Sequence, residues 1–217
     1  MNVREEIKIS RNKIIKATLD GIETSVELYQ KWSGGEWVCN APEYLLTVKI
    51  AESIAIEIEN IGAKELITLE DNLDYLLGLA DAKGKGSISN KVRKNGRCDI
   101  SVWREDEKPK ALIEVKNSVF SLRKITSDIN RIKEVLKRKT SKSTFEFGLI
   151  AFYIDRHYES GNAKNKIREQ AKKIFEQAKN LHKDINFKFH YREETTTLKD
   201  TDAWASVVFE ITRNANK

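Results

Sequence analysis

The fold is decided by CDISVW (residues 98–103), REDEKP (104–109) and KALIEVKN (110–117). The first and third stretches concentrate apolar and β-branched residues, as strands do, and the charged stretch between them is typical of a turn. Together they predict two neighbouring strands joined as a hairpin. Because alternate residues of a strand share a face, Glu114 and Lys116 are expected to point the same way. Asp99 then lies beside Glu114 if the strands pair around the turn.

Helices and further strands are expected on both sides of this hairpin. Before it, residues 1–31 are expected to form two helices with a break near Asp20-Gly21, and a third helix is expected to begin with Asn40 as its cap and Pro42 in its first turn. A short strand near Leu66 follows.

After the hairpin, the pattern predicts a helix at 122–138, a buried strand at 145–154, a helix at 163–181 and strands at 185–191 and 204–212. Strand–helix–strand order at 110–154 indicates a crossover with parallel pairing. The expected fold class is α/β, with a mixed central sheet flanked by helices and an N-terminal helical extension.

Composition and charge favour a globular protein with a basic surface. The chain has 217 residues, with 39 Lys+Arg against 33 Asp+Glu, a formal net charge of +6 and a pI near 9.1. This balance is a mild argument for a polyanionic partner, and a basic surface without such a partner is an equal alternative. The two cysteines fit no zinc or redox spacing. Without a signal-peptide pattern or an apolar run near the ~18 residues of a membrane span, we expect a cytoplasmic protein with no membrane partner.

The side chains of Asp99, Glu114 and Lys116 predict a metal-assisted chemistry. Two neighbouring carboxylates repel each other unless a cation lies between them, and oxygen ligands of this kind suit Mg²⁺. A metal there could hold a phosphate and lower the pKa of an attacking water, while Lys116 orients the water or neutralises charge. The alternative is a hairpin whose three charged side chains face water as a surface ion pair, worth about 0–1 kcal/mol. An acid two residues before a lysine occurs four times in the chain, but only Glu114 and Lys116 lie within an apolar strand.

The run GRCDISVW…KALIEVKNSV, with the following helix that contains SDINRI, resembles the PD-(D/E)XK nuclease superfamily over roughly residues 40–155. The resemblance implies a restriction-endonuclease-like core at 40–217, preceded by an extension at 1–39. It implies that Asp99, Glu114 and the Val115 carbonyl bind Mg²⁺ or Mn²⁺ and that Lys116 assists the water. The implied activity is hydrolysis of phosphodiester bonds, which we expect to be in DNA, with host defence or mobile-element biology as the setting and a homodimer as a possible assembly. Cys98 stands where the family signature has proline.

Nucleases of this superfamily often carry a further glutamate on the helix before the hairpin. Glu43 lies in the first turn of that helix on the side of Leu46 and Ile50, whereas Glu52 lies on the solvent side. We therefore expect Glu43 rather than Glu52 to complete the metal shell. The alternative for Glu43, which the sequence supports equally, is an acid that complements the helix dipole.

Basic residues near the hairpin are the predicted contacts to nucleic acid. They are Lys83, Lys85, Lys91, Arg93, Lys94 and Arg97 before it, and Arg131 on the helix after it. The alternative for 83–97 is a solvated loop. Two rival functions also stay open: a catalytically silent nucleic-acid-binding or assembly subunit on the same fold, and an interaction protein whose basic loop is incidental.

Overall fold

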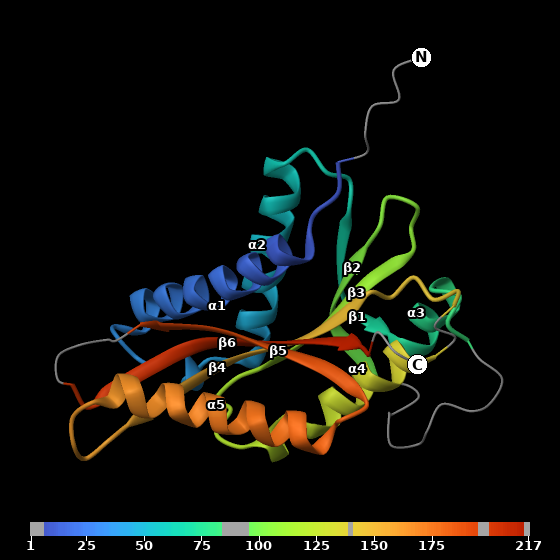
Figure 1. Cartoon of the computed structure of the whole chain (residues 1–217). Coiled ribbons are helices and arrows are strands. Elements are labelled where there is room, and N and C mark those ends of the chain that lie inside the picture. The colour runs from blue at the N-terminus through green and yellow to red at the C-terminus, as the bar shows by residue number, and fades with distance from the viewer. Residues whose placement is uncertain (1–6, 84–95, 139–140, 195–199, 215–217) are drawn as a thin grey trace.

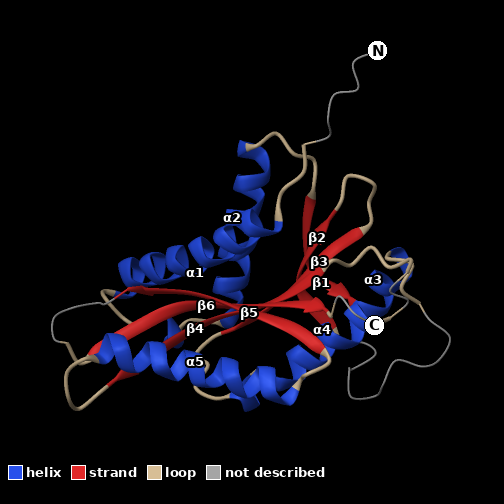
Figure 2. Cartoon of the chain, viewed as in Figure 1, coloured by secondary structure: helices blue, strands red, loops and turns tan. Residues whose placement is uncertain are grey.

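The computed structural model describes residues 7–83, 96–138, 141–194 and 200–214, and the strands in these ranges form one mixed sheet (Figures 1 and 2). The strand order is β1-β2-β3-β4-β6-β5. Only β3 and β4 pair in parallel, and the other neighbouring pairs are antiparallel. The strands are β1 (Leu66–Asn72), β2 (Arg97–Trp103), β3 (Pro109–Lys116), β4 (Phe147–His157), β5 (Ile185–Glu194) and β6 (Asp202–Arg213).

Helices cover both faces of the sheet, α1 and α2 on one side and α4 and α5 on the other (Figure 2). Each face has its own buried apolar cluster, so the predicted α/β class with a mixed, helix-flanked sheet and an N-terminal helix is confirmed. No helix in the described part of the chain is long and apolar enough to span a membrane. The helices are α1 (Arg11–Ser33), α2 (Glu43–Asn60), α3 (Leu73–Leu79), α4 (Thr126–Lys137) and α5 (Ala163–Leu181), with short 3₁₀ helices η1 (Val38–Asn40) and η3 (Leu122–Lys124).

The predicted hairpin and crossover are both present. Strands β2 and β3 pair antiparallel with Ile100 opposite Ile113, and β3 pairs in parallel with β4 after the chain has passed through α4. The helix expected at 122–138 is divided, because η3 comes first and Ile125 has a non-helical φ of −113° before α4 begins. This order brings the end of β3 and the start of α4 close together.

The expected break near Asp20-Gly21 is wrong, because α1 runs without interruption from Arg11 to Ser33. Gly21 lies where α1 crosses α2, and a Cβ built on it would come 2.5 Å from the Cα of Ile50. The glycine therefore serves close helix packing, a requirement that local sequence does not show. Helix α1 packs against α2 and also against β4 and β6. The domain boundary at 39/40 stays a prediction.

Substituting Gly21 by alanine should destabilise the protein although alanine is the better helix former. The added Cβ meets backbone that cannot rotate away, and overpacking of this kind costs about 1–3 kcal/mol. Gly78→Ala in α3 is the matched control, because its Cβ would meet only the flexible end of Lys83 at 3.5 Å. Urea unfolding of the two variants checks this, and equal stabilities would contradict the proposed crossing contact.

The expected cap of the third helix is also wrong. Helix α2 begins at Glu43 with Pro42 at the N-cap position, and Asn40 instead ends η1 and donates a hydrogen bond to Glu36 (2.9 Å). Ala41 is extended, with φ −82° and ψ 156°, because a residue before proline disfavours the helical region. The helix therefore starts two residues later than expected, with its cap at Pro42 instead of Asn40, which makes Glu43 its first residue.

Candidate active site at the ends of β2 and β3

Asp99, Glu114 and Lys116 meet where β2 begins and β3 ends. Asp99 Oδ2 accepts a hydrogen bond from the Val115 amide (2.6 Å) and lies 4.0 Å from Lys116 Nζ. Glu114 and Lys116 both reach α4, which confirms that they share one face of the strand. The Glu114 side chain is only 1% exposed, so the alternative of a hairpin with all three charges in water is wrong for this residue. We call this group, together with Glu43, Asp128 and Arg131, the Lys116 site.

Glu43 joins the site from α2 and bridges two consecutive residues of the chain. Its Oε1 accepts from Lys116 Nζ (3.1 Å) and its Oε2 accepts from the Asn117 amide (2.9 Å). The buried Asn117 side chain donates to the carbonyls of Val38 (2.9 Å) and Ala41 (3.2 Å), which ties the segment before α2 to the end of β3. The structure thus brings Glu43 to the predicted site. Glu52 is exposed and pairs with Lys49, as expected of the solvent side.

Helix α4 contributes two charged residues that complete the far wall of the site. Arg131 Nη1 donates to Glu114 Oε2 (2.6 Å), and its Nη2 lies 3.5 Å from Asp128 Oδ1. Asp128 Oδ2 lies 3.8 Å from Lys116 Nζ. The helix sits close to the sheet because Gly148 of β4 has no side chain: a Cβ there would come 2.3 Å from Ile132 Cγ2.

Sequence reasoning missed Asp128, although a signal was present. Asp128 follows Ile125 by three residues and precedes Ile132 by four, so it belongs to the apolar stripe of the helix. An acid in that position is buried, here 4% exposed in its side chain, and needs a charged partner. Asn117 gave no comparable signal, because its partners lie about eighty residues earlier in the chain.

Burial and crowded negative charge set the electrostatics of the site. Burial raises the pKa of Glu114 to about 8 against the opposing effect of Arg131, and burial also raises the pKa values of Asp99 and Asp128. Burial acts to lower the pKa of Lys116, but Asp128, Asp99 and Glu43 outweigh it and raise that pKa. Lys116 therefore stays an ammonium ion at neutral pH and acts as a cation rather than as a proton acceptor.

The metal-free protein should lose stability as pH rises from about 5 to about 8, and Glu114 should account for part of this loss. The folded state keeps the Glu114 proton up to a pKa of about 8, whereas the unfolded chain releases it near 4.5. Across this window the folded state binds more protons than the unfolded state, so higher pH favours unfolding. Unfolding midpoints measured with EDTA should therefore show a flatter pH profile for Glu114→Gln than for the wild type. Parallel profiles would contradict the raised pKa.

The basic residues predicted to bind nucleic acid are only partly within the described ranges. Lys85, Lys91, Arg93 and Lys94 lie outside them. Lys83 is exposed and pairs with Asp74 (2.9 Å), and Arg97 is exposed at the start of β2. The Arg131 side chain is only 12% exposed and is bound to Glu114 and Asp128. Its role in nucleic-acid binding stays a prediction.

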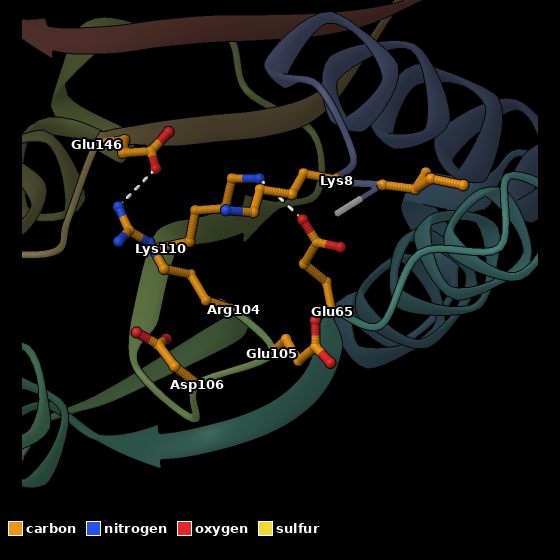
Figure 3. A pocket seen from close by; sticks show the side chains of 8 residues that line it. Lys8, Glu65, Arg104, Glu105, Asp106, Lys110 and Glu146 are labelled. Atoms are coloured by element: carbon orange, nitrogen blue, oxygen red, sulfur yellow. Dashed lines mark hydrogen bonds and ion pairs between the residues drawn. The ribbon is translucent and has the colours of Figure 1, made fainter. Parts of the chain in front are cut away.

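A separate pocket of about 230 Å³ lies at the other end of β3 (Figure 3). Lys110 and Lys116 are six residues apart in the strand, or about 20 Å. Glu65 and Lys110 form a buried ion pair beside this pocket (3.1 Å). The pocket is lined by Ile7, Lys8, Glu65, Arg104, Glu105, Asp106, Lys110 and Glu146. Three of these side chains are basic and four are acidic, so the charge of the lining does not indicate whether a ligand would be an anion or a cation.

The oxygen atoms of the Lys116 site are of the type that Mg²⁺ prefers, but they are not gathered around one point. In the described ranges, no group of three or more Asp, Glu, His or Cys side chains is arranged to hold a metal ion. Lys116 Nζ lies 3.1 Å from Glu43 Oε1 and 4.0 Å from Asp99 Oδ2, and it donates its shortest hydrogen bond to the Val115 carbonyl (2.8 Å). A cation bound to the Val115 carbonyl or to Glu43 would therefore compete with Lys116 for the same oxygen atoms.

The chain matches no protein-family model, no curated protein and no solved structure. The resemblance to the PD-(D/E)XK superfamily accordingly stays a prediction, and the case for function depends on the geometry of the site.

Proposed function

We propose that the chain is a metal-dependent nuclease of the PD-(D/E)XK type that hydrolyses phosphodiester bonds in DNA. The observation that carries the proposal is the convergence on Lys116 of carboxylates from separate elements: Glu43 from α2, Asp99 from β2 and Asp128 from α4. Asp128 is buried and Asp99 and Lys116 are only about one-fifth exposed, which makes gathering these charges costly, and a protein keeps such charges when they bind an ion or act in chemistry. The order α2, hairpin, α4 and β4 supports a restriction-endonuclease-like core.

The residues fit a divalent metal by charge and by donor type. Glu43, Asp99, Glu114 and Asp128 carry four negative charges when ionised, against two positive charges on Lys116 and Arg131, and one divalent cation would neutralise the excess. Glu114 Oε1 is buried and receives no hydrogen bond from the described part of the chain. Asp99, Glu114 and the Val115 carbonyl would hold Mg²⁺ or Mn²⁺, with Glu43 completing the shell.

Such a metal, when bound, supplies Lewis-acid activation of the phosphate and of a water molecule. The protein's own groups do the rest. Lys116 is held as an ammonium ion and can neutralise charge that develops on the phosphate. Arg131 donates to Glu114 Oε2, which fixes the carboxylate and leaves its buried Oε1 without a hydrogen bond from the described residues. The Val115 amide fixes Asp99 in the same way.

A catalytically silent nucleic-acid-binding or assembly subunit on the same fold is the second candidate. The ion pair between Arg131 and Glu114 favours it, because it already neutralises one carboxylate without a metal. A silent subunit gains no stability from Mg²⁺, whereas an enzyme that binds the metal only when folded must gain it.

Cleavage of supercoiled plasmid and of single-stranded oligonucleotides tests the proposal. The wild type should cut at least one substrate with Mg²⁺ or Mn²⁺ and neither with EDTA, and Lys116→Ala should lose this cleavage. A well-folded wild type that cuts neither substrate with either metal would shift the assignment to the silent subunit.

A further inference from the structure

A basic patch adjoins the Lys116 site on the side of α5. We call it the Phe120 patch after the residue whose ring Arg156 contacts, and we assign to it Arg123, Lys124, Arg156, Lys166 and Lys173. All are exposed except Lys166, which is half-buried. The patch is distinct from the basic segment at 83–97, since it comes from η3, β4 and α5.

Hydrogen bonds connect this patch to the residues that directly follow Lys116. Lys124 Nζ donates to the carbonyls of Asn117 and Ser118, the latter at 3.2 Å. The Arg156 guanidinium lies 5.1 Å from the centroid of the Phe120 ring, and Gln170 of α5 donates to the Phe120 carbonyl (2.8 Å). The patch therefore adjoins the segment at residues 117–120, which directly follows Lys116 at the end of β3. Figure 1 shows α5 on the same side of the sheet as α4.

The orientation of α5 decides which of its many cations belong to the patch. Lys166 precedes Gln170 by four residues and Lys173 follows it by three, so both share the side that faces Phe120. Lys172 and Lys179 lie on the opposite, outer side, at the same exposure as Lys173. The apolar side of α5 is buried in the core, which leaves no apolar face to enter a lipid bilayer.

We propose that the Phe120 patch binds the sugar-phosphate backbone of the nucleic acid and guides it into the Lys116 site. The inference deepens the proposed function and rests on it. Lysine and arginine contacts of this kind position a backbone without reading its sequence. Each neutralised phosphate releases counterions, so the patch should account for a measurable part of the salt dependence of binding.

Fluorescence anisotropy with a labelled DNA duplex, in EDTA to prevent cleavage, tests the proposal on the full chain. The patch variant is Lys166→Gln with Lys173→Gln, and the control is Lys172→Gln with Lys179→Gln on the outer side of the same helix. Both variants remove two positive charges from α5, but the half-buried Lys166 also donates to the carbonyl (3.0 Å) and hydroxyl (2.7 Å) of Ser160, so urea unfolding of both variants is measured beside binding to confirm that each stays folded. The patch variant should bind more weakly, with the slope of log K against log salt reduced by about 1.8, and the control should keep a slope close to the wild type.

Equal effects of the two variants, or none, would overturn the proposal, as would tighter binding of the wild type to anionic lipid vesicles than to the duplex. The two levels of inference fail separately. If the wild type cleaves DNA but the patch variant keeps its salt slope, the patch assignment is wrong and the nuclease stands. If the patch variant loses affinity but the wild type never cleaves, the patch is a binding surface and the nuclease assignment is wrong.

Discussion

Replacing Glu114 by glutamine should reduce metal-dependent DNA cleavage by a factor on the order of 10²–10³ or more. The amide is nearly the same size and can occupy the same buried position, but it supplies no negative charge to a cation. It also replaces the carboxylate that accepts from Arg131 at 2.6 Å, so that Arg131 keeps only Asp128 as an acidic partner among the described residues. Cleavage rates under saturating Mg²⁺ check this prediction.

Glu52→Gln is the matched control for this substitution. Glu52 belongs to α2, as Glu43 does, but it is exposed and pairs only with Lys49 in the described structure. Its substitution should leave the cleavage rate unchanged. If Glu114→Gln cleaves as fast as Glu52→Gln does, the Lys116 site is not the catalytic site.

Replacing Lys110 by methionine should destabilise the protein by about 3–5 kcal/mol, because Glu65 would be left as an uncompensated buried charge. The Lys110 and Glu65 side chains are 8% and 4% exposed. Lys110 Nζ also donates to the Ile9 carbonyl (2.7 Å), and Glu65 accepts from the Ile9 amide (3.0 Å). The pair therefore connects Ile9, which precedes α1, to Lys110 in β3 and to Glu65, which directly precedes β1.

Two controls separate this effect from ordinary loss of a lysine. Lys64→Met removes a cation from the exposed pair with Glu105 and should cost no more than about 1 kcal/mol. Lys110→Met combined with Glu65→Leu should recover most of the lost stability, since no buried charge remains. Urea unfolding measures all three, and a single Lys110 variant as stable as the Lys64 variant would contradict the buried pair.

Sequence periodicity predicted the elements that form the centre of the sheet. The alternation in CDISVW and KALIEVKN indicated β2 and β3, and the following helix and buried strand indicated the parallel pairing of β3 with β4. Local patterns suffice here because the faces of a strand and the order of elements leave few topologies open. The shared face of Glu114 and Lys116 follows from the same argument.

The errors arose where distant segments decide the structure. Gly21 was interpreted as a break because its partner Ile50 in α2 cannot be known from the neighbouring sequence. Asp128 was passed over although its place on the apolar stripe of α4 was a signal of burial, and only the folded chain shows that its partner is Lys116. The structure also gives Arg131 two buried acidic partners that the sequence did not show, and its assignment to nucleic acid stays a prediction. The sequence therefore did not show which side chains from distant segments contact each other in the folded protein.

Calorimetric titration of the wild type with Mn²⁺ tests the central claim, that these carboxylates hold a divalent cation, without requiring the right substrate. The wild type should bind Mn²⁺, and Asp99→Asn should weaken the affinity by roughly tenfold or more. Glu52→Gln should bind as the wild type does. Absence of Mn²⁺ binding to a folded wild-type protein, or equal binding by Asp99→Asn, would contradict the account.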